Sequence, residues 1–162
     1  MTKPGVRISP PSRALQAKIG GSAASMIQAP VGDAAEKNLA RLTPHLLADI
    51  TARLEQINAL ARARDEGVAL QVLAHAHQIR SIAGTLGRPK LGAAASVLCA
   101  YLKGVDARFR PDANLLTLIA VAAGQIQHAE GAGDPLVDEL IQDCAEAAAV
   151  TMAREGRTPR GR

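Results

Sequence analysis

The stretch VALQVLAHAHQIRSIAGTLGRPKLGAAASVLCAYLK, residues 68–103, decides the fold of this 162-residue chain. Apolar residues recur at alternating spacings of four and three on both sides of the break Gly87-Arg88-Pro89. Such spacing is typical of helices that bury one face in a bundle, and glycine followed by proline ends a helix. We therefore predict two helices, about Val68 to Leu86 and about Pro89 to Lys103, joined as an antiparallel hairpin. The first buried stripe should consist of Val72, Ala76, Ile79, Ala83 and Leu86, and the second of Leu91, Ala95, Leu98, Leu102 and Val105.

Further helical patterns lie on both sides of this hairpin. One runs from about Ala34 to Arg64, with a break or kink at Thr43-Pro44; another begins near Asp112, and a third opens with Asp134 as its cap and Pro135 at its first position. No segment alternates as a strand would, and aromatic residues are only 1% of the chain. The predicted fold is all-α: an antiparallel up-down-up-down four-helix bundle with an additional C-terminal helix.

Charge divides the chain into three parts. Residues 1–32 carry four basic and no acidic side chains, and residues 154–162 carry four arginines and one glutamate. Since the whole chain has a net charge of +4, residues 33–153 sum to −3. Both ends are rich in proline, glycine, serine or arginine and lack apolar periodicity. We expect a disordered basic N-terminal tail over 1–32, a helical bundle over 33–153 and a disordered basic C-terminal tail over 154–162.

Membrane and secretory classes find no support in the sequence. It contains no run of eighteen apolar residues, and its N-terminus lacks the apolar segment of a secretory signal. Cys99 and Cys144 both lie in apolar helical patterns, so we expect two reduced, buried thiols. These features lead us to expect a cytoplasmic protein.

The flank of the predicted helix 68–86 carries a pattern suited to phosphoryl chemistry. His77 is followed one turn later by Arg80 and Ser81, with Gly84 a further turn on, and residues three and four apart are neighbours on a helix. A phosphoryl group on the imidazole would find a guanidinium donor beside it, and the small residues leave room for a partner. Counting back from the turn places His77 level with roughly Cys99. Leu73, one turn before His77, extends the same surface.

Other functional readings are weaker. His75 and His77 are two residues apart and point to different faces, so no metal site is expected. The glycines near the turn follow no strand, so they do not form a phosphate-cradling loop, and phosphorylation from ATP is not expected. Gly84 serves either close helix packing or clearance for a partner, and the sequence leaves both open.

At these positions the chain resembles the histidine phosphotransfer (HPt) domains of bacterial two-component phosphorelays. The family motif is a histidine, an aliphatic residue at plus two, Lys or Arg at plus three, Gly or Ser at plus four and Gly at plus ten. The matching residues here are His77, Ile79, Arg80, Ser81 and Gly87. Arg80 stands where lysine is commonest and Ser81 where glycine is commonest. The resemblance covers about Thr43 to Ile126.

The resemblance implies a function and its residues. Nε2 of His77 would attack the acyl phosphate of a receiver-domain aspartate, or accept the group from a sensor kinase, and pass it to another response regulator. Arg80 would stabilise the phosphoryl group, while Leu73, Ser81 and Gly84 would contact the partner. The metal ion would sit on the receiver, so no cofactor is expected here, and no small-molecule substrate.

Two alternatives stay open. The bundle could bind receiver or kinase domains as an adaptor without carrying phosphate. It could also bind nucleic acid through its basic tails, but the acidic body and scarcity of aromatics make nucleic acid a partner that we do not expect. No membrane partner is expected.

Overall fold

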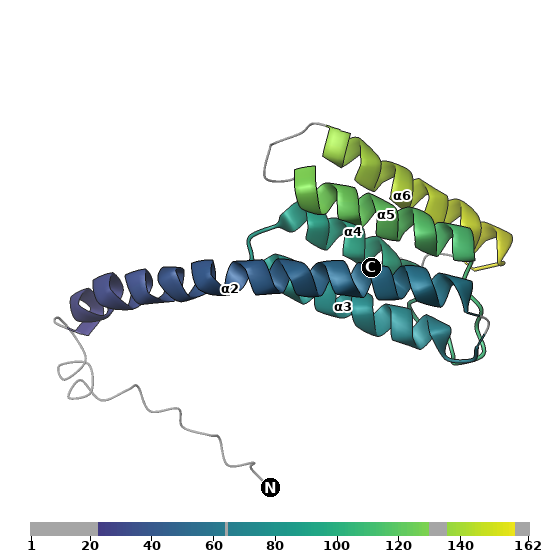
Figure 1. Cartoon of the computed structure of the whole chain (residues 1–162). Helices are drawn as coiled ribbons and strands as arrows, with labels where there is room; N and C mark the ends of the chain where they lie inside the picture. The colour runs from purple at the N-terminus through teal and green to yellow at the C-terminus, as the bar shows by residue number, and fades with distance from the viewer. Residues whose placement is uncertain (1–22, 64, 130–135, 158–162) are drawn as a thin grey trace, which may run out of the picture. The chain divides into compact units, whose positions relative to one another are not determined.

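The computed structural model describes residues 23–63, 65–129 and 136–157 of the chain (Figure 1). The elements are α2 (Ala23–Arg62), α3 (Val68–Thr85), α4 (Pro89–Tyr101), α5 (Ala113–Ala129) and α6 (Leu136–Arg154). The fold is all-α, and no strand occurs within the described ranges. None of these helices is both long and apolar enough to cross a membrane.

Helix α2 differs from the sequence prediction at its start and middle. It begins at Ala23 and not near Ala34, so residues 23–32 are helical although we assigned them to the tail; residues 1–22 lie outside the described residues. Alanine, methionine, isoleucine and glutamine dominate residues 23–29, and most of these are good helix formers. The helix also continues through Pro44, so the predicted break does not occur. A boundary between two compact units nevertheless falls just before Thr43. The second unit starts at Thr43 and contains α3 to α6.

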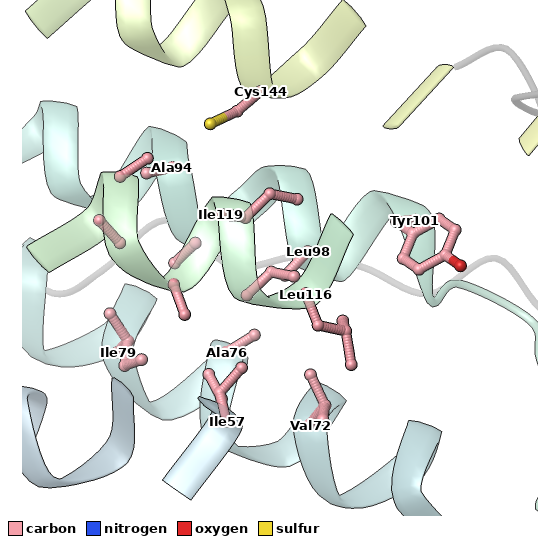
Figure 2. Close-up of a cluster of buried hydrophobic side chains, with 14 of the residues drawn as sticks. Ile57, Val72, Ala76, Ile79, Ala94, Leu98, Tyr101, Leu116, Ile119 and Cys144 are labelled. Atoms are coloured by element: carbon pink, nitrogen blue, oxygen red, sulfur yellow. The ribbon is translucent and has the colours of Figure 1, made fainter. Parts of the chain in front are cut away.

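The core of this unit is built from the predicted apolar stripes (Figure 2). The stripe of α3 is buried from Val72 to Ala83, whereas Leu86, at the helix end, is only half-buried. On α4 the stripe is buried from Leu91 to Leu102, and Val105 is half-buried beyond it. Helix α4 packs against α3, α5 and α6, and α5 also packs against α6. The other elements add large buried side chains, among them Ile50, Ile57, Leu116, Ile119, Ile126 and Cys144.

The predicted tight turn between α3 and α4 is confirmed, because only Leu86, Gly87 and Arg88 separate the two helices. Gly87 has a φ of +65°, a left-handed conformation that favours glycine. The Arg88 amide donates to the Ala83 carbonyl at 2.8 Å, and the Gly87 amide donates to the Gly84 carbonyl at 3.2 Å. These bonds satisfy carbonyls at the end of α3, and Pro89 then begins α4. The turn therefore determines which residues of α4 lie beside His77 on α3.

Part of the predicted C-terminal tail is structured. Arg154 ends α6, and beyond it both Glu155 and Arg157 bond to the segment around Tyr101. The Tyr101 hydroxyl donates to Glu155 Oε1 at 2.7 Å, and Arg157 donates to Glu155 Oε2 at 3.0 Å and to the Tyr101 carbonyl. The Arg157 guanidinium also lies 4.6 Å from the ring centroid of Phe109. We call Tyr101, Phe109, Glu155 and Arg157 the C-terminal clasp; residues 158–162 of the predicted tail lie outside the described residues.

Candidate functional site

The five residues predicted to form the site share one face of α3. His77 is exposed and directly follows Ala76, which is fully buried in the stripe that packs against the core. Because 3.6 residues make one helical turn, the positions four before and three, four and seven after His77 lie on its side of the helix. Of these, the residue before it is half-buried and the others are exposed. We call this surface the His77 face; its members are Leu73, His77, Arg80, Ser81 and Gly84.

The neighbouring helix supplies the closest polar contact of the imidazole. Nδ1 of His77 lies 3.8 Å from Sγ of Cys99 on α4, within hydrogen-bonding distance for sulfur. This pairing agrees with the register expected by counting back from the turn. Cys99 is only 8% exposed, so its sulfur reaches the imidazole from the edge of the core. Among the described residues, no other hydrogen bond to the His77 ring is found, which leaves Nε2 available on the exposed side.

Electrostatics couple Arg80 to the same spot. Burial raises the pKa of the Cys99 thiol above its ordinary value, and the positive charge of Arg80 partly opposes that rise. The guanidinium is therefore near enough to act on the sulfur that contacts His77. The raised pKa also keeps Cys99 a neutral thiol at neutral pH. The site thus consists of an exposed imidazole that contacts a buried thiol through Nδ1, with a cation one helical turn away.

The surroundings of Gly84 bear on one of its two possible roles, close helix packing. A Cβ built at Gly84 would have no atom within 4 Å beyond its own helix, so Gly84 does not serve close helix packing. That role falls to Gly92 on α4, where an added Cβ would lie 3.8 Å from the Cβ of Ala83. Gly84 is exposed and contributes open space beside Ser81. Clearance for a partner on the His77 face stays a prediction.

His75 has a separate environment that the sequence analysis missed. Its Nδ1 is buried without a hydrogen-bond partner, and it faces the Asp49–Arg53 ion pair of α2. Burial lowers the pKa of His75, Arg53 lowers it further, and Asp49 partly opposes both effects. His75 and His77 therefore do not act together. Within the described ranges no group of three metal-ligating side chains is found, so the predicted lack of a metal site is not contradicted.

A cavity among the described residues lies away from the His77 face. It has a volume of about 540 Å³ and is open to solvent. It is formed near the end of α2 and the start of α5, and none of the predicted site residues lines it. Lining residues include Leu60, Arg62, Val68, Arg110, Asn114 and Thr117.

The chain matches no known family model, and no curated protein or solved structure is significantly similar to it. The functional assignment therefore depends on the residues of the His77 face.

Proposed function

We propose that this chain is a phosphorelay intermediate of the histidine phosphotransfer type. It accepts a phosphoryl group on His77 from a receiver-domain aspartate or a sensor kinase and passes it to another response regulator. The observation that carries the proposal is the exposed His77 imidazole, whose Nδ1 is engaged by Cys99 while Nε2 is left open. Receiver domains and hybrid kinases are its partners, and the cytoplasm is its compartment.

The chemistry requires one nucleophile and no resident cofactor. The lone pair on Nε2 of neutral His77 attacks the phosphorus of the aspartyl phosphate. A P–N bond forms as the P–O bond to the aspartate breaks, and the carboxylate leaves with the bonding electrons. The ring keeps its Nδ1 proton throughout. Transfer to the next aspartate is the same step in reverse, which suits a carrier that must both accept and release the group.

Arg80 is the residue that favours the phosphorylated state. Its guanidinium is exposed, so it can reorient towards the phosphoryl oxygens, and it starts one turn from His77. Its charge acts on the Cys99 sulfur, which lies 3.8 Å from Nδ1 of His77. The rest of the His77 face consists of half-buried Leu73 and the small residues Ser81 and Gly84. These residues leave room for a receiver domain to approach the imidazole.

The finer architecture belongs to the same proposal. We infer an antiparallel up-down-up-down four-helix bundle, built from α2 to α5, with α6 as the additional helix. The packing of α4 against α3 and α5, the short α3–α4 turn and the buried α2 side chains Ile50 and Ile57 support this arrangement. Helix α6 packs against α4 and α5. A bundle of this kind would hold the His77 face rigid, so little ordering would be required when a partner docks.

Phosphoramidate, a small phosphodonor, tests carriage without any partner. Intact mass of the wild type after incubation should show a single acid-labile phosphoryl adduct, and His77→Gln should show none. His128 is another exposed histidine, on α5, so His128→Gln is the matched control and should be labelled like the wild type. An unlabelled wild type, or an adduct that persists in His77→Gln, would contradict the proposal and favour an adaptor.

A further inference from the structure

The contact between Cys99 and His77 connects the edge of the core to the exposed face of α3. On α4, Cys99 directly follows Leu98, which is 1% exposed, and its own side chain is 8% exposed. On α3, His77 lies between buried Ala76 and Ile79, which are 0% and 1% exposed. The tight turn fixes the register of the two helices. The distance of 3.8 Å between Sγ and Nδ1 thus joins a sulfur held by the packed core to an exposed ring whose backbone position is fixed by the core face of α3.

Hydrogen bonding at Nδ1 decides which nitrogen of the ring is nucleophilic. A neutral imidazole has one N–H and one nitrogen with a free lone pair. If Nδ1–H donates to Sγ, the lone pair is on Nε2 and faces outwards. If the thiol donates to Nδ1, the proton is on Nε2, and the outward nitrogen cannot attack phosphorus. The direction of this one bond therefore separates a competent ring from an incompetent one.

The proposed function itself requires sulfur to be the acceptor, because Nε2 can attack phosphorus only while the ring proton is on Nδ1. Burial keeps the Cys99 thiol neutral, and a neutral sulfur retains lone pairs that can accept Nδ1–H. The contact of 3.8 Å places the sulfur within reach of Nδ1. The reverse assignment, in which His77 activates Cys99 as a nucleophile, conflicts with the burial of the thiol and with its raised pKa. A buried neutral thiol can support a reacting group but cannot easily meet a substrate.

We propose that Cys99 is a positioning residue for His77: its sulfur accepts the Nδ1 proton and holds the ring in the tautomer that presents the Nε2 lone pair to a phosphodonor. This assignment rests on the proposed function, because it explains how His77 is prepared for the phosphoryl group. It also gives Cys99 a role beyond filling the core beside Leu98.

The test reads the tautomer directly. Long-range ¹H–¹⁵N NMR correlations of the ¹⁵N-labelled full chain distinguish Nδ1–H from Nε2–H in the His77 ring at a pH where the imidazole is neutral. The wild type should show Nδ1–H. Cys99→Ala should shift the ring towards Nε2–H and slow labelling by phosphoramidate about two- to five-fold, the effect of losing one weak hydrogen bond. Cys99→Ser keeps an acceptor and should restore the tautomer and most of the rate.

Cys144→Ala is the matched control, because Cys144 is also a buried thiol but lies on α6. It incurs a similar cost of core truncation and should leave the His77 tautomer unchanged. Nε2–H in the wild type, or the same tautomer in wild type and Cys99→Ala, would overturn the assignment of Cys99. That result could coincide with normal labelling of His77, which would leave the proposed function standing. Loss of labelling with a Cys99-dependent tautomer would instead refute carriage and retain the positioning contact.

Discussion

His75 and His77 are separated by two residues and lie in opposite environments. The helical period alone turns them to different faces, and the buried stripe between them decides that His77 is the exposed one. His75 instead turns towards Asp49 and Arg53 of α2, where its Nδ1 is buried without a partner. The His77 imidazole is therefore accessible, whereas a proton on His75 would place a charge in a partly buried environment and reduce stability.

The lowered pKa of His75 makes stability depend on pH. In the unfolded chain this histidine takes up a proton near the ordinary histidine pKa of 6.5, whereas in the folded chain burial and Arg53 resist protonation. The unfolded state therefore binds more protons in that window. The free energy of unfolding should fall as the pH drops through 6.5 towards the folded pKa.

We expect His75→Gln to reduce this loss, measured by urea unfolding at about pH 7.5 and about pH 5.5. The variant removes the group that titrates and keeps a polar side chain of similar length. His128→Gln removes an exposed histidine and should leave the difference between the two pH values as in the wild type. Equal pH dependence in wild type and His75→Gln would show that another group is responsible.

The two histidines also show what the sequence could predict at this scale. The exposure of His77, Arg80, Ser81 and Gly84 follows from the register of the apolar stripe, which is a property of one helix. The environment of His75 could not be predicted in this way. It depends on which side chains of α2 face α3, and that choice is made by packing between segments distant in the sequence.

At the scale of the element, α3 and the turn that follows it each contain a glycine, and the two have opposite consequences. Gly84 lies inside the helix with open space around its Cβ position, whereas Gly87 lies just past the end with a φ of +65°. The first conformation suits any residue, and there alanine has a higher helix propensity than glycine. The second is strained for a residue that carries a Cβ.

The same substitution at the two positions should therefore change stability in opposite directions. Gly84→Ala should raise the free energy of unfolding by about 1 kcal/mol, and Gly87→Ala should lower it by about 1–2 kcal/mol. Urea unfolding of both variants beside the wild type measures this. A destabilising Gly84→Ala would mean that the position is more crowded than the structure indicates.

A second prediction for α3 concerns docking on the His77 face. Gly84→Arg fills the open space beside Ser81 with a long side chain, and helicity should be preserved because arginine is a good helix former. Labelling by phosphoramidate should persist in this variant, while transfer from a phosphorylated receiver domain should be blocked. Gly84→Ala adds only a methyl group and is the control that should retain both reactions. Unimpaired transfer in Gly84→Arg would count against the proposed docking surface.

The elements themselves could be predicted with uneven success. The end of α3 follows from Gly87 and the start of α4 from Pro89. Both residues act locally, so sequence and structure agree there within a few residues. The start of α2 was missed because residues 23–32 lack an apolar stripe and include Pro30 and Gly32, which are poor helix formers. Only residues 23–29 have a composition that favours a helix, and the helix continues past them.

At the scale of the whole molecule, the C-terminal clasp brings together residues that are far apart in the sequence. Tyr101 and Phe109 are the only aromatic residues of the chain, and Arg157 lies over both rings, at 5.4 Å and 4.6 Å from their centroids. The Tyr101 hydroxyl also accepts the Asp112 amide at 2.9 Å, so the clasp ties the end of α6 to the α4–α5 connection. Composition alone marks residues 154–162 as a basic tail, because nothing local indicates that Arg157 meets two aromatic rings.

Truncation at two points should separate the clasp from the residues beyond it. A chain ending at Arg157 keeps every clasp contact and should unfold like the full chain. A chain ending at Arg154 loses the bonds of Glu155 and Arg157 and both cation–π contacts, so its free energy of unfolding should fall by about 2–4 kcal/mol. Tyr101 is the single tyrosine and the chain has no tryptophan, so its fluorescence during urea unfolding reports on the clasp directly.

Arg157→Ala should reproduce most of the loss, whereas Arg154→Ala, at an exposed position, should not. If the chains ending at Arg154 and Arg157 unfolded at the same urea concentration, the clasp would contribute nothing to stability and the end of α6 would be held by the apolar core alone.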